Sequence, residues 1–234
     1  MTPQVIVGVL GGMGPEATID LFSKIVRSTK ATRDQDHLRL IIDNNTWIPS
    51  RQDAILANGR SPLPMLIESA KKLENAGADF IVMPCNTAHY WIEEIRDAVT
   101  IPITDMIQET AKATVRLYPK LKTAGILAAT GTIRTGLYQT RFENVGISTV
   151  VPADADQATL MNAIYSIKEQ GSSDSSNFSA KKVGHKLIQA GAEAIVAGCT
   201  EIPLTLKIGD LNVPVIDATQ VLATRTIEIA WAGV

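Results

Sequence analysis

An internal repeat constrains this sequence more than any other feature does. The stretch AGADFIVMPCNTA (76–88) aligns without gaps with AGAEAIVAGCTEI (190–202), and each contains one of the chain's two cysteines. Two further pairs of segments match in the same order along the chain, 5–18 with 122–135 and 100–106 with 212–218. Three matched blocks in one order predict two related halves, because two copies are too few for a solenoid of stacked repeats.

Within each half, short apolar runs alternate with segments whose apolar residues recur at helical spacing. The run VIVGVL (5–10), for example, is followed by the helical pattern EATIDLFSKIVRST (16–29). Strands that alternate with helices predict a parallel sheet covered on both faces. We therefore expect an α/β fold of two pseudo-symmetric, doubly wound parallel-sheet domains, with the functional site in the cleft between them.

The domain boundaries follow from the repeat. The N-terminal domain, which holds the first cysteine, is expected to comprise residues 1–110 together with 219–234, because the last helical pattern is expected to pack back on the first domain. The C-terminal domain, which holds the second cysteine, is expected to comprise 111–218.

One stretch has low complexity. Helices are expected at 156–170 and 179–190, and the serine-rich EQGSSDSSNFS (169–179) is predicted to form a solvated loop between them. The alternative is a mobile lid over a site, centred on 171–177.

Composition excludes several classes of function. The chain of 234 residues is 45% hydrophobic and 20% charged, with a net charge of −2, so it offers no basic field for nucleic acid. No apolar run approaches the ~18 residues that span a bilayer, and the first residues lack a basic leader. We expect a cytoplasmic protein with no membrane or nucleic-acid partner.

The two cysteines are expected to be free thiols. Reducing cytosol disfavours disulfides, and the chain has no CxxC motif. The three histidines, His37, His89 and His185, show no metal-ligand spacing to either cysteine, so no metal site is expected.

Each cysteine follows a predicted buried strand and precedes a predicted helix. Ligands of open parallel sheets bind at the carboxyl ends of strands, and a helix N-terminus there is expected to lower the pKa of a thiol. If the two halves face each other about a rough two-fold axis, the two thiols lie on opposite sides of a small ligand.

Two equivalent acid/base groups on opposite sides of one carbon suit the inversion of a stereocentre. One thiolate removes a proton from one face, and the opposite thiol donates a proton to the other face. A hydrolase would instead need one nucleophile and a distinct base. A single cysteine at a strand end is more often a small buried hydrophobic residue, but the matched pair favours the chemical role.

These motifs resemble a known family. IVMPCNTAHY (81–90) and IVAGCTEIPLTL (195–206) are similar to the two cysteine signatures of the aspartate/glutamate racemase family, and GVLGGMGPEAT (8–18) resembles its aspartate racemase and broad-specificity branch. Glutamate racemases carry Asp-Ser-Gly near the start and usually a histidine after the second Cys-Thr, where this chain has Gly11-Gly12-Met13 and Glu201. The resemblance covers essentially the whole chain.

The resemblance implies a racemase that needs no pyridoxal phosphate or other cofactor, acts on an amino acid, most of all aspartate, and forms a homodimer. Cys85 and Cys199 would be the two proton donors and acceptors. The residues that would hold the substrate carboxylate and ammonium are Asn86, Thr87 and Thr200, with Thr130 contributing from the matching loop of the second half.

Two basic residues would serve an acidic substrate by the same resemblance: Arg51 in the loop after the second strand, and Lys168 after a Tyr-x-x-Ile-Lys pattern. From chemistry alone, an arginine suits a carboxylate. Glu201 could orient the second thiol or could cap a helix. Gly12 and Met13 lie in a turn that could bring backbone N–H groups to the substrate.

Three other hypotheses compete with an aspartate racemase. A neutral or broad-specificity racemase would make Arg51 and Lys168 irrelevant to side-chain choice. A decarboxylase or isomerase of the same superfamily would typically lack one cysteine of the pair. A two-lobed, non-catalytic binding protein would use both cysteines only for packing. For His89, packing or hydrogen bonding is favoured over catalysis.

Overall fold

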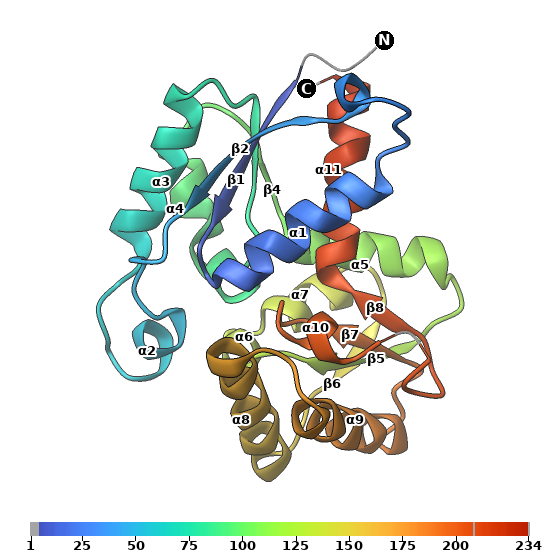
Figure 1. The fold of residues 1–234 in the computed structure, drawn as a ribbon. Helices are drawn as coiled ribbons and strands as arrows, with labels where there is room; N and C mark the ends of the chain where they lie inside the picture. The colour runs from blue at the N-terminus through green and yellow to red at the C-terminus, as the bar shows by residue number, and fades with distance from the viewer. Residues whose placement is uncertain (1–4, 208, 234) are drawn as a thin grey trace. The chain divides into compact units, whose positions relative to one another are not determined.

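The computed structural model describes residues 5–207 and 209–233 of the chain. It divides into two compact units (Figure 1): the first comprises the chain up to Glu109 together with the part from Thr219 onward, and the second comprises Thr110–Ala218. Each unit contains a four-stranded parallel sheet, and the strand order is the same in both, β2-β1-β3-β4 and β6-β5-β7-β8. The predicted α/β class, with one parallel sheet in each half, is confirmed.

The first unit is built from alternating strands and helices, as the apolar pattern predicts. Strands β1 and β2 pair in parallel with Ile6 opposite Arg39, and β1 pairs on its other side with β3, Val7 opposite Phe80. Its elements are β1 (Ile6–Gly11), α1 (Pro15–Ser28), β2 (Arg39–Asn44), α2 (Arg51–Leu56), α3 (Leu63–Asn75), β3 (Phe80–Val82), α4 (Ile92–Arg96), β4 (Ile103–Thr104) and the start of α5 (Met106–Leu117), with 3₁₀ turns at Asp34–Asp36 and Thr87–Trp91.

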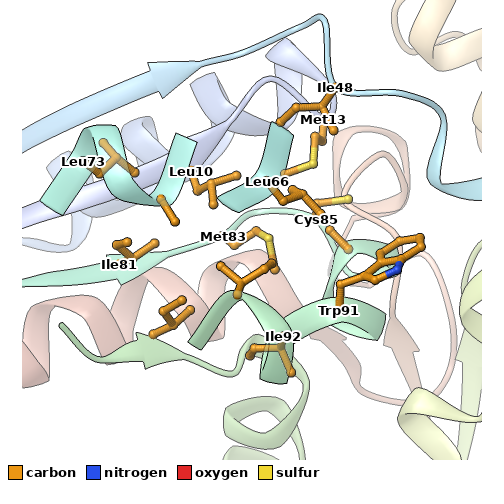
Figure 2. Packing of buried hydrophobic residues seen from close by; sticks show 14 of the residues in the cluster. Leu10, Met13, Ile48, Leu66, Leu73, Ile81, Met83, Cys85, Trp91 and Ile92 are labelled. Atoms are coloured by element: carbon orange, nitrogen blue, oxygen red, sulfur yellow. The ribbon is translucent and has the colours of Figure 1, made fainter. Parts of the chain in front are cut away.

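Helices cover both faces of this first sheet. Figure 1 shows α3 and α4 on one side, and α1 with the last helix, α11 (Ala218–Ala232), on the other. On the α3 side, Leu66 and Leu73 pack against Leu10 and Ile81 of the strands in one hydrophobic cluster (Figure 2). On the other side, α11 is tied to the end of α1 by a hydrogen bond from the Gln220 amide to Ser28 Oγ.

The second unit repeats the same architecture with its own elements. They are β5 (Thr123–Leu127), α6 (Thr130–Arg134), α7 (Leu137–Glu143), β6 (Ser148–Val150), α8 (Asp154–Gln170), α9 (Asp174–Gln189), β7 (Ala194–Ala197), α10 (Ile202–Thr205) and β8 (Val215–Asp217). Its hydrophobic cluster joins Leu160 and Ile164 of α8 and Leu187 of α9 to Leu127 and Ile195 of the sheet.

The repeat extends to individual hydrogen bonds. In the first unit the Asp79 carboxylate accepts a hydrogen bond from the backbone N–H of Ile6 at 2.6 Å, just where β1 begins. In the second unit the Glu193 carboxylate accepts one from the N–H of Lys122 at 2.6 Å, just before β5. Each acidic residue directly precedes the third strand of its sheet in chain order. The same hydrogen bond from carboxylate to backbone therefore anchors the start of the first strand in both copies.

Close packing of helix on sheet is also repeated. A Cβ added to Gly8 would lie 3.0 Å from Ala78 Cβ and 3.3 Å from Leu73 Cβ. A Cβ added to Gly125 would lie 3.0 Å from both Ala192 Cβ and Leu187 Cβ. A side chain at either position would push the covering helix away from the sheet, because these neighbours are the first carbons of their side chains and cannot swing aside.

The serine-rich stretch is the main correction to the expected elements. Residues 169–179 do not form a loop: α8 continues to Gln170 and α9 begins at Asp174, so only 171–173 are outside a helix. Ser173 caps α9 in a capping box. The Ser173 hydroxyl accepts a hydrogen bond from the N–H of Ser176 at 3.2 Å, and Ser176 Oγ accepts one from the N–H of Ser173 at 2.9 Å. The serines are therefore a helix start signal.

Replacing Gly125 with alanine is expected to lower the free energy of unfolding by about 1–3 kcal/mol, because overpacking forces α9 and the sheet apart. Urea denaturation followed by circular dichroism measures the change. Gly184→Ala is the control: in α9 its new methyl group would meet only the end of the Leu211 side chain, at 2.9 Å, and the better helix propensity of alanine offsets the adjustment. Equal losses in both variants would contradict this account.

Candidate active site

Both cysteines lie just beyond the carboxyl end of an inner strand of their sheet. Cys85 follows β3, which lies between β1 and β4, and Cys199 follows β7, which lies between β5 and β8. Both are free thiols, and they are only 6% and 7% exposed. The predicted placement of the two thiols at equivalent strand ends is confirmed within each unit.

Each thiol also packs in the hydrophobic cluster of its own unit. Figure 2 shows Cys85 near Met13, Ile48 and Trp91, at the end of the first cluster away from Leu73. Cys199 belongs to the corresponding cluster of the second unit. The two cysteines therefore contribute to packing whatever chemistry they carry.

The backbone at Cys85 is held by His89. The Nδ1 atom of His89 lies 2.8 Å from the Cys85 carbonyl oxygen, and its Nε2 accepts a hydrogen bond from the N–H of Met106 at 3.0 Å. Since Nε2 is an acceptor, the ring proton is on Nδ1, which donates to the carbonyl. The hydrogen-bonding role expected for His89 is confirmed: the ring joins the Cys85 turn to the start of α5.

The side chain at Cys199 is held by a carboxylate. The thiol donates a hydrogen bond to Glu201 Oε2 at 2.9 Å, and the Thr200 hydroxyl donates to the same oxygen at 3.2 Å. The other oxygen, Oε1, forms an ion pair with Lys168 Nζ at the end of α8. Glu201 is the N-cap residue of α10, but its side chain makes no capping hydrogen bond, so the capping alternative was wrong.

The expectation of a lowered thiol pKa was wrong for Cys199. Burial, followed by the negative charge of Glu201, raises the pKa of the Cys199 thiol well above its usual range, and the positive charge of Lys168 opposes this only in part. Helix α10 has four residues, and the partial charge at its N-terminus is small beside burial and a carboxylate in contact. The surroundings of Cys199 therefore favour the protonated thiol over the thiolate.

Two predicted substrate residues, Asn86 and Thr87, follow Cys85 directly and are buried. The Gln52 amide of α2 donates a hydrogen bond to the Thr87 hydroxyl at 3.2 Å, which fixes the position of that hydroxyl. Sequence reasoning missed Gln52, because its only signal is that it follows the predicted site residue Arg51.

Gly12 in the glycine-rich turn has a structural role of its own. Gly12 has φ +87°, and a Cβ there would lie 2.4 Å from the backbone of Asn45, so only glycine fits. Its N–H is already bonded, donating to the Thr18 hydroxyl at 2.9 Å. Gly12 is thus explained by the close approach of two backbones. Met13 beside it is buried.

Arg51 is the first residue of α2 and not part of a loop, because Ser50 caps this helix by accepting from the N–H of Asp53 at 3.2 Å. Its guanidinium donates to the carbonyls of Ile48 at 3.1 Å, Pro49 at 2.9 Å and Met13 at 3.3 Å. Arg51 therefore joins the turn that holds Met13 to the segment before α2.

Thr130 opens α6 at the carboxyl end of β5, in the second unit. Its hydroxyl accepts a hydrogen bond from the Gln157 amide at 3.1 Å, and the same amide donates to the Ala128 carbonyl at 3.0 Å. Gln157 is buried in α8. Sequence reasoning missed it because no local pattern shows that this glutamine of a helix hydrogen-bonds the Thr130 loop.

Among residues 5–207 and 209–233, no group of three or more His, Cys, Asp and Glu side chains could hold a metal ion.

Comparison with known proteins assigns the chain to a family. A family model described as Asp/Glu/hydantoin racemase matches residues 10–226. The chain belongs to the Asp/Glu/hydantoin racemase family. This membership supports an isomerase, the enzyme class to which racemases belong.

Relatives in the family match the chain over almost its full length. A broad specificity amino-acid racemase, RacX, of Bacillus subtilis is 28% identical over 226 residues, with 95% of this chain and 96% of the relative covered. The solved structure of an aspartate racemase from Picrophilus torridus is 32% identical, with a TM-score of 0.88, and covers 97% of this chain and 94% of that chain. An aspartate racemase homologue from Pyrococcus horikoshii is 26% identical, with a TM-score of 0.78 and coverage of 96% and 98%.

We expect the hydrogen bonds of His89 to contribute strongly to the stability of the folded protein, because they hold the Cys85 turn. His89→Ala is expected to lower the free energy of unfolding by about 2–4 kcal/mol, because it leaves a cavity and removes the hydrogen bonds of the ring to the Cys85 carbonyl and the Met106 N–H. Chemical denaturation measures the loss. His185→Ala is the matched control at an exposed position of α9 and is expected to change stability by less than about 0.5 kcal/mol. A similarly small loss of unfolding free energy in His89→Ala would contradict the structural role of its two hydrogen bonds.

Proposed function

We propose that this chain is an amino-acid racemase that works without pyridoxal phosphate and exchanges the α-proton through Cys85 and Cys199. The observation that carries the proposal is that the chain's only two thiols occur at the same place in two copies of one sheet. A packing role alone requires no such match, and the family is one of racemases.

The proposed reaction needs both thiols at one substrate carbon. One sulfur, as thiolate, takes the α-proton from one face, while the other, as thiol, gives a proton to the opposite face. A carbanion at that carbon needs stabilisation of the adjacent carboxylate, which backbone N–H groups and the side chains of Asn86, Thr87 and Thr200 would supply in a site closed to water. That the two units bring the thiols to a shared substrate is part of this proposal.

Aspartate is the substrate that we propose first. The Picrophilus torridus relative is named an aspartate racemase, and Arg51 and Lys168 are the two basic residues that the family resemblance assigns to an acidic substrate. An arginine and a lysine would together recognise a second carboxylate by charge-assisted hydrogen bonds.

The second candidate is a broad-specificity amino-acid racemase, and two observations favour it. RacX of Bacillus subtilis has that description and matches 95% of the chain. In addition, both basic side chains already have protein partners: Arg51 donates to main-chain carbonyls, and Lys168 pairs with Glu201. The homodimer that the resemblance implies stays a prediction.

Incubation with L-aspartate in heavy water tests the reaction itself. Racemisation is expected, with deuterium appearing at Cα of newly formed D-aspartate while the remaining L-aspartate keeps its proton early in the reaction, because the acid on the product side exchanges with solvent. Chiral chromatography with mass spectrometry measures both. Cys85→Ser and Cys199→Ser are each expected to lower the rate by roughly 10²- to 10⁴-fold.

Several outcomes would overturn the two-thiol proposal. Near-normal turnover in either serine variant would remove that cysteine from the chemistry. No conversion across a panel of amino acids would favour the two-lobed binding protein. A short bifunctional thiol reagent such as dichloroacetone should also link Cys85 to Cys199 within one chain at a pH high enough to ionise both thiols. Failure of the link under those conditions in active protein would contradict a shared substrate site.

Substrate choice is tested at Arg51. Arg51→Ala is expected to raise the KM for aspartate by roughly 10-fold or more relative to alanine, because a hydrogen bond between charged groups is worth about 1.5–3 kcal/mol. Steady-state kinetics with both substrates measures the ratio. Arg60→Ala, at an exposed position after α2, is the control. An equal effect on both substrates would contradict a role of Arg51 in recognising an acidic side chain. Arg51 would then serve only to hydrogen-bond the Met13 turn to the segment before α2.

A further inference from the structure

Glu201 is the centre of a small polar cluster inside the second unit. Its side chain is 4% exposed, yet three groups contact it: Cys199 Sγ and Thr200 Oγ1 on Oε2, and Lys168 Nζ on Oε1. A carboxylate this buried is retained only when it is paired and hydrogen-bonded. Among the described residues, its partners lie beside Cys199 or come from the end of α8, so the Glu201 side chain organises the surroundings of this thiol.

The cluster favours the protonated form of Cys199. A carboxylate that accepts the S–H hydrogen bond at 2.9 Å stabilises the thiol and repels the thiolate. Burial acts in the same direction, and Lys168 acts in the opposite one. Lys207, the next charged residue along the chain, donates to the carbonyls of Pro203 and Leu204 at the far end of α10.

Cys85 has a different environment. Its carbonyl is held by the neutral His89 ring, and its N–H donates to the Met83 carbonyl at 2.9 Å. Within the described part of the chain, no carboxylate is hydrogen-bonded to the Cys85 sulfur as Glu201 is to Cys199. The repeat thus places two thiols at equivalent strand ends but gives only the second one an acidic partner.

We propose that Glu201 is a positioning residue that keeps Cys199 in the thiol form in the resting protein, so that Cys199 is the first proton donor and Cys85 the first base. This inference rests on the proposed function. In the step, the Cys85 thiolate takes the α-proton and becomes a thiol, while the Cys199 S–H bond breaks and its proton forms the new C–H bond. Proton and charge balance, and the Cys199 thiolate then lies against the Glu201 carboxylate.

Lys168 adjusts this arrangement. Its ammonium neutralises part of the Glu201 charge, which lowers the cost of the Cys199 thiolate that each turnover creates. Without Lys168 the thiol would be a poorer proton donor, and without Glu201 its proton would be held less firmly at rest. The pair therefore sets the acidity of the Cys199 thiol.

The test measures the protonation of Cys199 in the free protein. The protein has only two cysteines, so labelling them with ¹³C at Cβ gives two resonances, and Cys85→Ser assigns them. In unsubstituted protein the Cys199 resonance is expected to keep its thiol position through pH 9. Glu201→Gln is expected to lower its titration midpoint by roughly one to three pH units, because a like charge beside the thiolate is removed. Glu169→Gln, which removes a carboxylate at the exposed position next to Lys168, is expected to leave it unchanged.

Each outcome bears on the proposal by itself. A Cys199 resonance that titrates below pH 9 in unsubstituted protein would overturn it, and so would an unchanged midpoint in Glu201→Gln. If Glu201→Gln does not fold, Lys168→Met provides the second measurement, with an expected upward shift. These titrations need no substrate, so they remain interpretable even if racemisation is not observed. In active protein, Glu201→Gln should also move the basic limb of the kcat/KM profile to lower pH by the same amount, which a merely structural role would not do.

Discussion

A parallel sheet covered by helices on both faces has one place where polar chemistry is possible, the edge at which its strands end. In this chain β3 and β7 are inner strands, so the residues that follow them emerge from the buried centre of each sheet. Cys85 and Cys199 occupy these positions and remain buried among apolar side chains. The low exposure and the packing of both cysteines follow from that single constraint.

Much of the fold could be predicted from the sequence because its periods are clear and occur twice. The alternation of apolar runs and helical patterns predicts the strands and long helices, and the gapless match of 76–88 with 190–202 predicts the equivalence of β3 and β7. The serine-rich stretch was misinterpreted because serine is typical of both loops and helix N-termini, and only the reciprocal bonds of Ser173 and Ser176 distinguish them.

The site was less predictable, since its decisive contacts join residues far apart in sequence. Lys168 and Glu201 are 33 positions apart, and no local pattern shows that the second oxygen of that carboxylate holds a thiol. The direction of the Cys199 pKa shift could not be read from a strand end and a following helix. It depends on burial and on a charged neighbour, which only the folded chain reveals. Arg51 likewise proved to be bonded to main-chain carbonyls.

The contact between Cys199 and Glu201 also affects how this sulfur withstands oxidation. Peroxides attack the thiolate, so a cysteine that stays protonated reacts slowly with them. The hydrogen bond that keeps the proton on Cys199 therefore protects the sulfur from conversion to sulfenic acid at neutral pH. In the proposed reaction Cys199 becomes a thiolate once in each turnover, and that interval is when peroxide would attack its sulfur.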